Sequence, residues 1–94
     1  MKKKIIILGS TGSIGKNTIE IIRNDKKNFD IKLLSTNKNI SEVIKQAKEF
    51  NVKDIIINDY IKFIKEKNKY KKLNINFYNS FFIFKELFKK KSIY

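Results

Sequence analysis

The stretch ILGSTGSIGKNT (residues 7–18) decides the fold, because it joins a run of β-branched residues to a helical pattern through three glycines. Gly9, Gly12 and Gly15 stand three residues apart, directly after the apolar run KIIIL at residues 4–8. Such a short apolar run is typical of a strand buried on both faces in a parallel sheet. A glycine loop between a strand and a helix N-terminus is suited to phosphate, so this stretch predicts a nucleotide-binding α/β fold.

Two kinds of nucleotide phosphate can lie on such a loop, that of a nucleoside triphosphate and that of a dinucleotide. The triphosphate motif is G-x-x-x-x-G-K-[ST], in which the lysine reaches the terminal phosphates and the hydroxyl binds Mg²⁺. Counting back from Gly15 and Lys16 puts Ser10 at the first glycine position, and Asn17 stands at the hydroxyl position. Two required residues are therefore missing, which argues against a triphosphate.

The dinucleotide interpretation fits the observed G-x-x-G-x-x-G spacing, a relative of the G-x-G-x-x-G fingerprint. We expect Gly9 to let the chain turn out of the strand, Gly12 to let the backbone approach a pyrophosphate, and Gly15 to let the helix pack on the sheet. The helix N-terminus adds N–H donors, and Thr11 and Ser13 add hydroxyl donors. A glycine turn that only connects strand to helix is the alternative, but it requires neither three evenly spaced glycines nor two hydroxyls.

The choice between NAD and NADP depends on the tip of the expected second strand, at residues 29–36. A carboxylate about 20 residues past the loop would accept the ribose hydroxyls of NAD. The chain instead has STNKN at residues 35–39, with no acidic residue. Lys38 offers a cation, and Asn37, Asn39, Ser35 and Thr36 offer donors, which suits the 2′-phosphate of NADP. The alternative is that Lys38 is one more surface lysine in a lysine-rich chain.

The order of patterns along the chain predicts the fold class: α/β, with a Rossmann-like, doubly wound parallel sheet of about four strands. Strand and helix patterns alternate, and the connections are too short for hairpin pairing. The expected strands cover residues 4–8, 29–36, 53–59 and 73–79, and the expected helices cover residues 13–24, 41–50, 60–67 and 80–90.

Two helices carry explicit signals. The first has Ile14, Thr18, Ile21 and Ile22 at helical spacing, so we expect the loop to open a helix that ends near Asn24. Ser41 is the expected N-cap of the second helix. Its apolar face is expected to contain Val43, Ile44, Ala47 and Phe50.

The net charge of +13 raises the question of a nucleic-acid partner. The lysines do not gather in one basic arm, because they recur in every segment as solvated faces of amphipathic elements. The abundance of Lys, Ile and Asn also fits an AT-rich genome. We therefore expect no nucleic-acid partner.

The composition also limits chemistry and location. The chain has no Cys and no His, so it has no disulfide, no thiolate and no histidine base. We name no catalytic residue and no metal ligand in it. The apolar run Ile5–Leu8 is shorter than the roughly 7–15 residues of a signal-peptide core. We expect a cytoplasmic chain without a membrane partner.

The unbroken GSTGSIG at residues 9–15 closely resembles the N-terminal, NADPH-binding part of the 1-deoxy-D-xylulose 5-phosphate reductoisomerase family. The spacing to NKN at residues 37–39, KEF at 48–50 and IIIND at 55–59 follows the order of that family. Beyond Asp59 the likeness is one of pattern only.

The resemblance implies cofactor contacts for individual residues. It implies that Lys38 and Asn39 hold the 2′-phosphate end of NADPH. Asn37 stands where the family usually has glycine, and asparagine is the residue that best tolerates a left-handed backbone after glycine. The pyrophosphate and the adjacent ribose are implied to lie against Thr11, Gly12, Ser13 and Ile14.

The resemblance also implies an activity. In that family 1-deoxy-D-xylulose 5-phosphate is isomerised and then reduced by NADPH to 2-C-methyl-D-erythritol 4-phosphate, with Mg²⁺ or Mn²⁺, in the non-mevalonate route to isoprenoids. The metal carboxylates, the substrate phosphate ligands and a histidine-bearing loop are implied to lie downstream of residue 94. A homodimer is implied as well.

We therefore expect residues 1–94 to form an NADP(H)-binding domain that is inactive alone. KKKSIY at residues 89–94 stops where a fifth strand is expected, so we expect the chain to be truncated. The alternative is a stand-alone nucleotide-binding or basic interaction module without catalysis.

Overall fold

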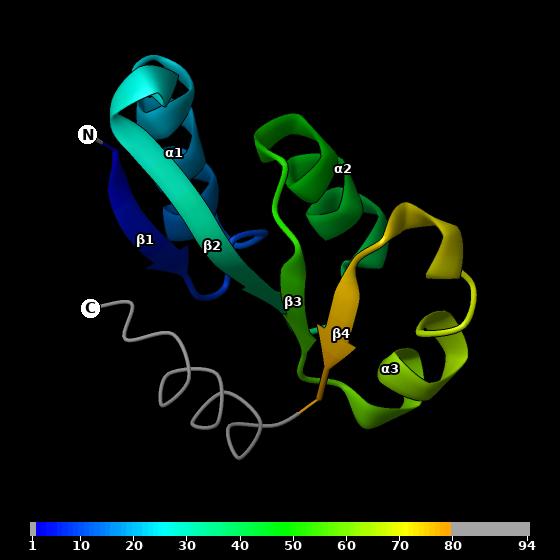
Figure 1. Cartoon of the computed structure of the whole chain (residues 1–94). Coiled ribbons are helices and arrows are strands. Elements are labelled where there is room, and N and C mark those ends of the chain that lie inside the picture. Colours follow the sequence, from blue (N-terminus) through cyan, green and yellow to red (C-terminus); the bar gives the residue numbers. More distant parts are fainter. Residues whose placement is uncertain (1, 80–94) are drawn as a thin grey trace.

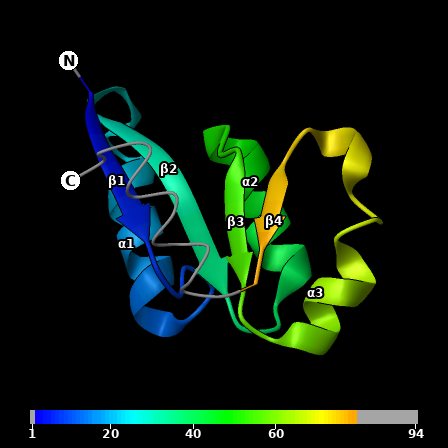
Figure 2. The same ribbon diagram turned by 60° about the horizontal axis from the view of Figure 1, so that its bottom comes forward.

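A parallel sheet of four strands, in the order β1-β2-β3-β4, forms the centre of the chain (Figures 1 and 2). The structure is a computed structural model, and it describes residues 2–79. Strands and helices alternate as expected, so the Rossmann-like α/β fold is confirmed. The strands are β1 (Lys3–Ile7), β2 (Phe29–Thr36), β3 (Asp54–Ile57) and β4 (Asn76–Tyr78); the helices are α1 (Ser13–Arg23), α2 (Ile40–Phe50) and α3 (Tyr60–Glu66), with 3₁₀ turns at Lys26–Asn28 and Lys71–Leu73.

Three strands differ in their bounds from the sequence prediction. β1 ends at Ile7, because Leu8 is half exposed and already belongs to the loop. β3 ends at Ile57, although Asn58 still donates its N–H to the carbonyl of Thr36, the last residue of β2, and Asp59 donates to the carbonyl of Asn37 just after it. β4 begins late, after Asn74 has turned the chain with a φ of 58°. The helix expected at residues 80–90 lies outside the described residues.

The apolar residues at helical spacing in α1 do not all face the core. Ile22 is buried, but Ile14 is 82% and Ile21 67% exposed. The buried stripe is instead Gly15, Ile19 and Ile22, at positions i, i+4 and i+7 of the helix. The close approach of Gly15 to the loop sets the rotation of the helix, and sequence spacing alone could not reveal that contact.

The N-cap of α2 is Asn39, and the expectation of Ser41 is wrong. The Asn39 side chain accepts a hydrogen bond from the Glu42 N–H at 3.3 Å, whereas Ser41 lies inside the first turn. Asparagine and serine are comparably good N-caps, so residue type alone could not distinguish Asn39 from Ser41. The predicted apolar face is confirmed for Val43, Ile44 and Ala47, which are buried, and Phe50 packs against the same core.

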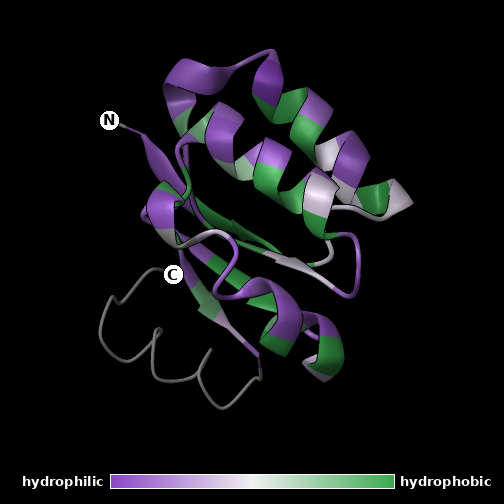
Figure 3. Cartoon of the chain, turned by 90° about the vertical axis from the view of Figure 1, so that its right-hand side faces the viewer, coloured by the Kyte–Doolittle hydropathy of each residue, from purple (hydrophilic) through white to green (hydrophobic). Residues whose placement is uncertain are grey.

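The sheet has one face against the helices and a second, smaller apolar face. The helix-side core joins Ile55 and Ile57 of β3 to buried residues of α1 and α2, and Phe63 of α3 packs against it. The second cluster contains Leu33 and Ile56, with Ile6 and Tyr78 against them. Figure 3 shows hydrophobic stretches alternating with hydrophilic ones along each helix, as amphipathic packing requires.

A β-bulge in the pairing of β1 with β2 places apolar residues of β2 on both faces of the sheet. Ile5 pairs with Ile31, but Ile6 pairs with Leu33, so Lys32 is an extra residue in β2. An extra residue shifts the alternation of side chains. Ile31 and Leu34 therefore reach the helix-side core, while Leu33 reaches the other face.

β1 is less buried than its apolar sequence predicted. It lies at one edge of the described sheet, and Lys3 and Lys4 are exposed. Only Ile7 is buried, where the strand enters the loop. The expectation of a strand covered on both faces is therefore wrong for the described part of the chain.

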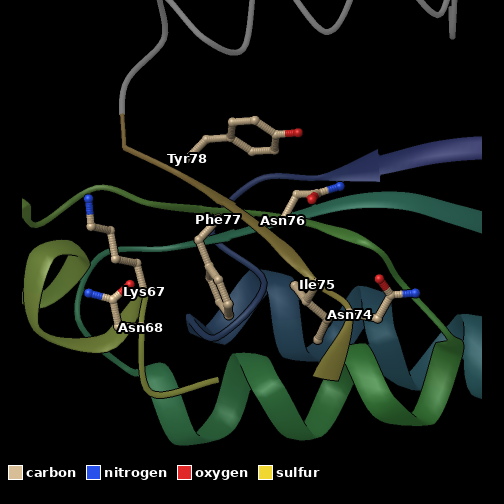
Figure 4. Close-up of a pocket in the computed structure, with 7 residues that line it drawn as sticks. All are labelled: Lys67, Asn68, Asn74, Ile75, Asn76, Phe77 and Tyr78. Carbon is tan, nitrogen blue, oxygen red and sulfur yellow. The ribbon is translucent and has the colours of Figure 1, made fainter. Parts of the chain in front are cut away.

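Tyr78 gives the fold a measurable pH dependence. Figure 4 shows its side chain on the face of β4 opposite to Phe77. Its hydroxyl donates to Oδ1 of the buried Asp54 at 3.2 Å. Burial first, and then the Asp54 carboxylate, raise the pKa of Tyr78 to about 12 from 10.0.

The unfolded chain therefore loses this proton at a lower pH than the folded chain, and we expect stability to fall as pH rises from about 10 to 12. Tyr78→Phe should remove the contribution of Tyr78 to this loss of stability. The measurement is urea unfolding of the unmodified chain and of the variant, followed by circular dichroism across this pH range. Equal slopes of unfolding free energy against pH for the two chains would contradict the assignment.

Candidate dinucleotide-binding site

The glycine loop leaves the carboxyl end of β1 and lies beside the carboxyl end of β2 (Figure 2). Gly9 has a φ of +67°, in the left-handed region that favours glycine. Its N–H donates to Oγ of Ser35 at 2.7 Å. The turn out of the strand is thus fixed by the backbone of Gly9 and by the last residues of the neighbouring strand.

The loop is bound to β2 through Ser10 and Thr11 as well. The buried Ser10 donates its N–H to the Ser35 carbonyl at 2.9 Å, and its hydroxyl contacts the same oxygen at 3.3 Å. The Oγ1 atoms of Thr11 and Thr36 are 2.7 Å apart. These contacts span at least 25 residues of sequence, so the loop conformation depends on the sheet.

Gln46 supports the loop from α2. It is buried, and its Nε2 donates to the Ser10 carbonyl at 3.0 Å. Ser35 and Thr36, expected as donors to a 2′-phosphate, are instead buried and contact the glycine loop, and sequence reasoning missed Gln46 as a supporting residue. A signal did exist: a polar Gln46 stands within the apolar face of a helix, where an unpaired amide would be costly.

The three glycines differ in what a side chain would meet. At Gly15 a Cβ would lie 2.2 Å from the Gly9 carbonyl oxygen and 2.6 Å from Cα of Ser10, so the backbone would have to move. At Gly12 the nearest atom would be 3.5 Å away, an ordinary contact. The fold therefore requires glycine at position 15 but leaves room at position 12.

The N-terminus of α1 has donors available for a ligand. Gly12 is the N-cap and supplies no side-chain cap, and the first intrahelical bond runs from the Lys16 N–H to the Gly12 carbonyl. The N–H groups of the first turn have no intrahelical acceptor and carry the positive end of the helix dipole. A cavity of about 480 Å³ opens here, lined by Ile7, Leu8, Gly9, Gly12, Ser13, Ile14, Gly15 and Thr18.

The structure brings the predicted loop residues together, and it places residues 37–39 next to them at the end of β2. Thr11 does not line the cavity but contacts Thr36, on the β2 side of the loop. Asn39 caps α2, as described above, and Lys38 is 66% exposed. The candidate site is therefore a surface that runs from the cavity over the loop to the first turn of α2.

Asp59 is a site neighbour that sequence reasoning missed. Its Oδ2 lies 3.8 Å from Nζ of Lys38, and its Oδ1 accepts from the Lys62 N–H at 2.9 Å as the N-cap of α3. Its own N–H donates to the Asn37 carbonyl at 3.1 Å. The Asp59 carboxylate thus competes with any bound anion for the ammonium group of Lys38. Because the Lys38–Asp59 ion pair is exposed, it is weak.

A second cavity, of about 450 Å³, lies along β4 (Figure 4). It is lined by Lys67, Asn68, Asn74, Ile75, Asn76, Phe77 and Tyr78. No glycine loop opens into it. We therefore assign the candidate site to the glycine loop.

Among residues 2–79, no group of three or more acidic, Cys or His residues is placed to hold a metal ion. Within the same range, no helix is long and apolar enough to cross a membrane.

Comparison with known proteins identifies the family. A family model for 1-deoxy-D-xylulose 5-phosphate reductoisomerase matches residues 5–91. The chain belongs to this family. The 1-deoxy-D-xylulose 5-phosphate reductoisomerase of Pelagibacter ubique is 48% identical over 79 residues, which is 84% of this chain and 20% of that protein. The Clostridium tetani enzyme of the same name is 40% identical over 74 residues, 79% of this chain and 19% of that protein.

Solved structures of the family share the fold. The Zymomonas mobilis reductoisomerase in complex with NADPH superposes with a TM-score of 0.77 at 24% identity, covering 85% of this chain and 21% of that one. A reductoisomerase in complex with magnesium gives a TM-score of 0.71, also at 24% identity, covering 84% and 20%. The chain thus spans about one fifth of the length of these relatives, and the recognition of the family from GSTGSIG is confirmed.

Proposed function

We propose that residues 1–94 form the NADPH-binding part of a 1-deoxy-D-xylulose 5-phosphate reductoisomerase. The observation that carries this proposal is the room for a side chain at Gly12, where a Cβ would make only an ordinary 3.5 Å contact, beside a helix N-terminus whose first N–H groups have no intrahelical acceptor. A loop that only connected β1 to α1 would not require glycine at position 12. The family membership supports the choice of a nicotinamide dinucleotide.

The residues present fit the proposed cofactor at both of its phosphate groups. The pyrophosphate would lie against the bare backbone of Gly12, the N–H groups of Ser13 and Ile14 and the hydroxyl of Thr11. The Gly12 N–H itself already donates to the Gly9 carbonyl at 3.1 Å, within the loop. Gly9 and Gly15 would act by shaping this loop rather than by touching phosphate.

The 2′-phosphate would lie near the end of β2. Lys38 would supply a charge, and Asn39 and Asn37 would supply the neighbouring backbone and amide donors. The absence of a carboxylate at residues 35–39 leaves nothing there to accept a ribose 2′-hydroxyl in the manner of NAD enzymes.

In the whole enzyme, bound NADPH supplies the hydride for reduction. The part played by this chain is to hold the dinucleotide, orient it across the carboxyl ends of β1 and β2, and select the phosphorylated form. The isomerisation and reduction of 1-deoxy-D-xylulose 5-phosphate, the Mg²⁺ or Mn²⁺ that assists it, the homodimer and the cytoplasmic location all stay predictions from the family. So does the expectation that the chain alone is inactive.

A titration tests the proposal directly. The chain contains no Trp, so the fluorescence of NADPH itself can be followed without interference from indole. We expect a saturable rise in emission with one NADPH per chain. No change in emission, supported by no heat in calorimetry at the same concentrations, would contradict the proposal and favour a basic interaction module without a nucleotide.

A further inference from the structure

Thr36 is a buried threonine at the end of β2 whose hydroxyl meets the glycine loop. Its side chain is 1% exposed, and its Oγ1 lies 2.7 Å from Oγ1 of Thr11. Thr11 is half-buried and lies on the surface of the candidate site. We propose that Thr36 is a positioning residue, which turns the hydroxyl proton of Thr11 outward for a phosphate oxygen of the bound dinucleotide. This inference rests on the proposed function.

The direction of the hydrogen bond follows from counting protons. Each hydroxyl has one proton to donate and can also accept. If Thr11 donated to Thr36, the buried Thr36 proton would need a further acceptor, and residues 2–79 offer its hydroxyl no partner besides Thr11. A buried donor without an acceptor is costly, so Thr36 donates and Thr11 accepts.

The proton of Thr11 is then free to point away from β2. A phosphate oxygen accepts hydrogen bonds and donates none, so only this arrangement makes Thr11 a phosphate ligand. A hydroxyl that accepts one hydrogen bond is also a stronger donor in the next. Fixing the Thr11 rotamer before binding reduces the conformational entropy that binding must remove.

Valine is the informative replacement for Thr36, because it has the same branched shape and lacks the hydroxyl. Serine keeps the hydroxyl and loses the methyl group. Ile31→Val is the matched control: it removes one methyl group from a buried position of β2 in the helix-side core, away from the loop. It shows what slight destabilisation of the strand does to binding by itself.

The experiment compares NADPH affinity, by fluorescence titration, for the full chain and for the variants Thr36→Val, Thr36→Ser, Thr11→Val and the double valine variant. We expect Thr36→Val to weaken binding about 3- to 10-fold, the range of one net hydrogen bond. Thr36→Ser and Ile31→Val should bind close to the unmodified chain. The double variant should bind no more weakly than Thr11→Val, because both changes remove the same contact to phosphate.

Unchanged binding in Thr36→Val would overturn the inference while leaving the proposed function in place, and so would a double variant whose loss is the product of the two single losses. A Thr36→Ser variant as weak as Thr36→Val would also overturn it, since the hydroxyl would then not be what matters. If the unmodified chain does not bind NADPH, the proposed function fails and this inference fails with it. Thermal unfolding of each variant confirms that all titrations are made on folded protein.

Discussion

Gly12→Val is expected to abolish NADPH binding while the chain stays folded. A Cβ at this position would meet only the Gly9 carbonyl oxygen, at 3.5 Å, and φ there is −81°, which any residue adopts. The valine methyl groups would instead occupy the space that a pyrophosphate needs to reach the first N–H groups of α1. Fluorescence titration with NADPH and far-UV circular dichroism give the two readouts.

Gly15→Ala is the matched control for this variant. Its Cβ would lie 2.2 Å from the Gly9 carbonyl oxygen, so this change should destabilise the fold by about 1–3 kcal/mol or more. We therefore expect Gly12→Val to affect NADPH binding and Gly15→Ala to affect the stability of the fold. A Gly12→Val chain that still binds NADPH would mean that the loop is a connector.

Lys38→Ala is expected to weaken NADPH binding about 10- to 150-fold, since a hydrogen bond to a charged group contributes roughly 1.5–3 kcal/mol. NADH has no 2′-phosphate, so its affinity should change little. Calorimetric titrations with both nucleotides provide the comparison. Equal losses for NADPH and NADH would show that Lys38 does not read the 2′-phosphate.

Asp59→Asn completes the test of charge at this end of the site. Asparagine can keep the cap on the Lys62 N–H, while the negative charge 3.8 Å from Nζ of Lys38 disappears. NADPH should then bind more tightly, by a few-fold at most because the pair is exposed, and NADH should not. Weaker NADPH binding in this variant would mean that Asp59 orients Lys38 rather than competing with the phosphate.

The loop and the order of strands and helices along the chain could be predicted because they depend on local signals. Apolar β-branched runs mark β1 and β3, and glycines at threefold spacing mark the turn into α1. The roles expected for Gly9 and Gly15 agree with the positive φ of the first and the close backbone contact of the second. The role of Gly12 stays a prediction, because no ligand contact tests it.

The rest depends on contacts between distant residues, which a single sequence does not display. The rotation of α1 that exposes Ile14 follows from where Gly15 meets the loop. The support of the loop by Ser35, Thr36 and Gln46 depends on β2 and α2 arriving beside it. Polar residues at a strand end and within an apolar helix face were the only hints of that support.

The most direct test of the central claim is an NMR titration of the ¹⁵N-labelled chain with NADPH. The account predicts that the amide signals of Gly12, Ser13 and Ile14 shift most, together with those of Lys38 and Asn39, and that NADH leaves the last two nearly unmoved. Shifts confined to the cavity along β4, at Asn74–Tyr78, or no shifts at saturating NADPH, would contradict it.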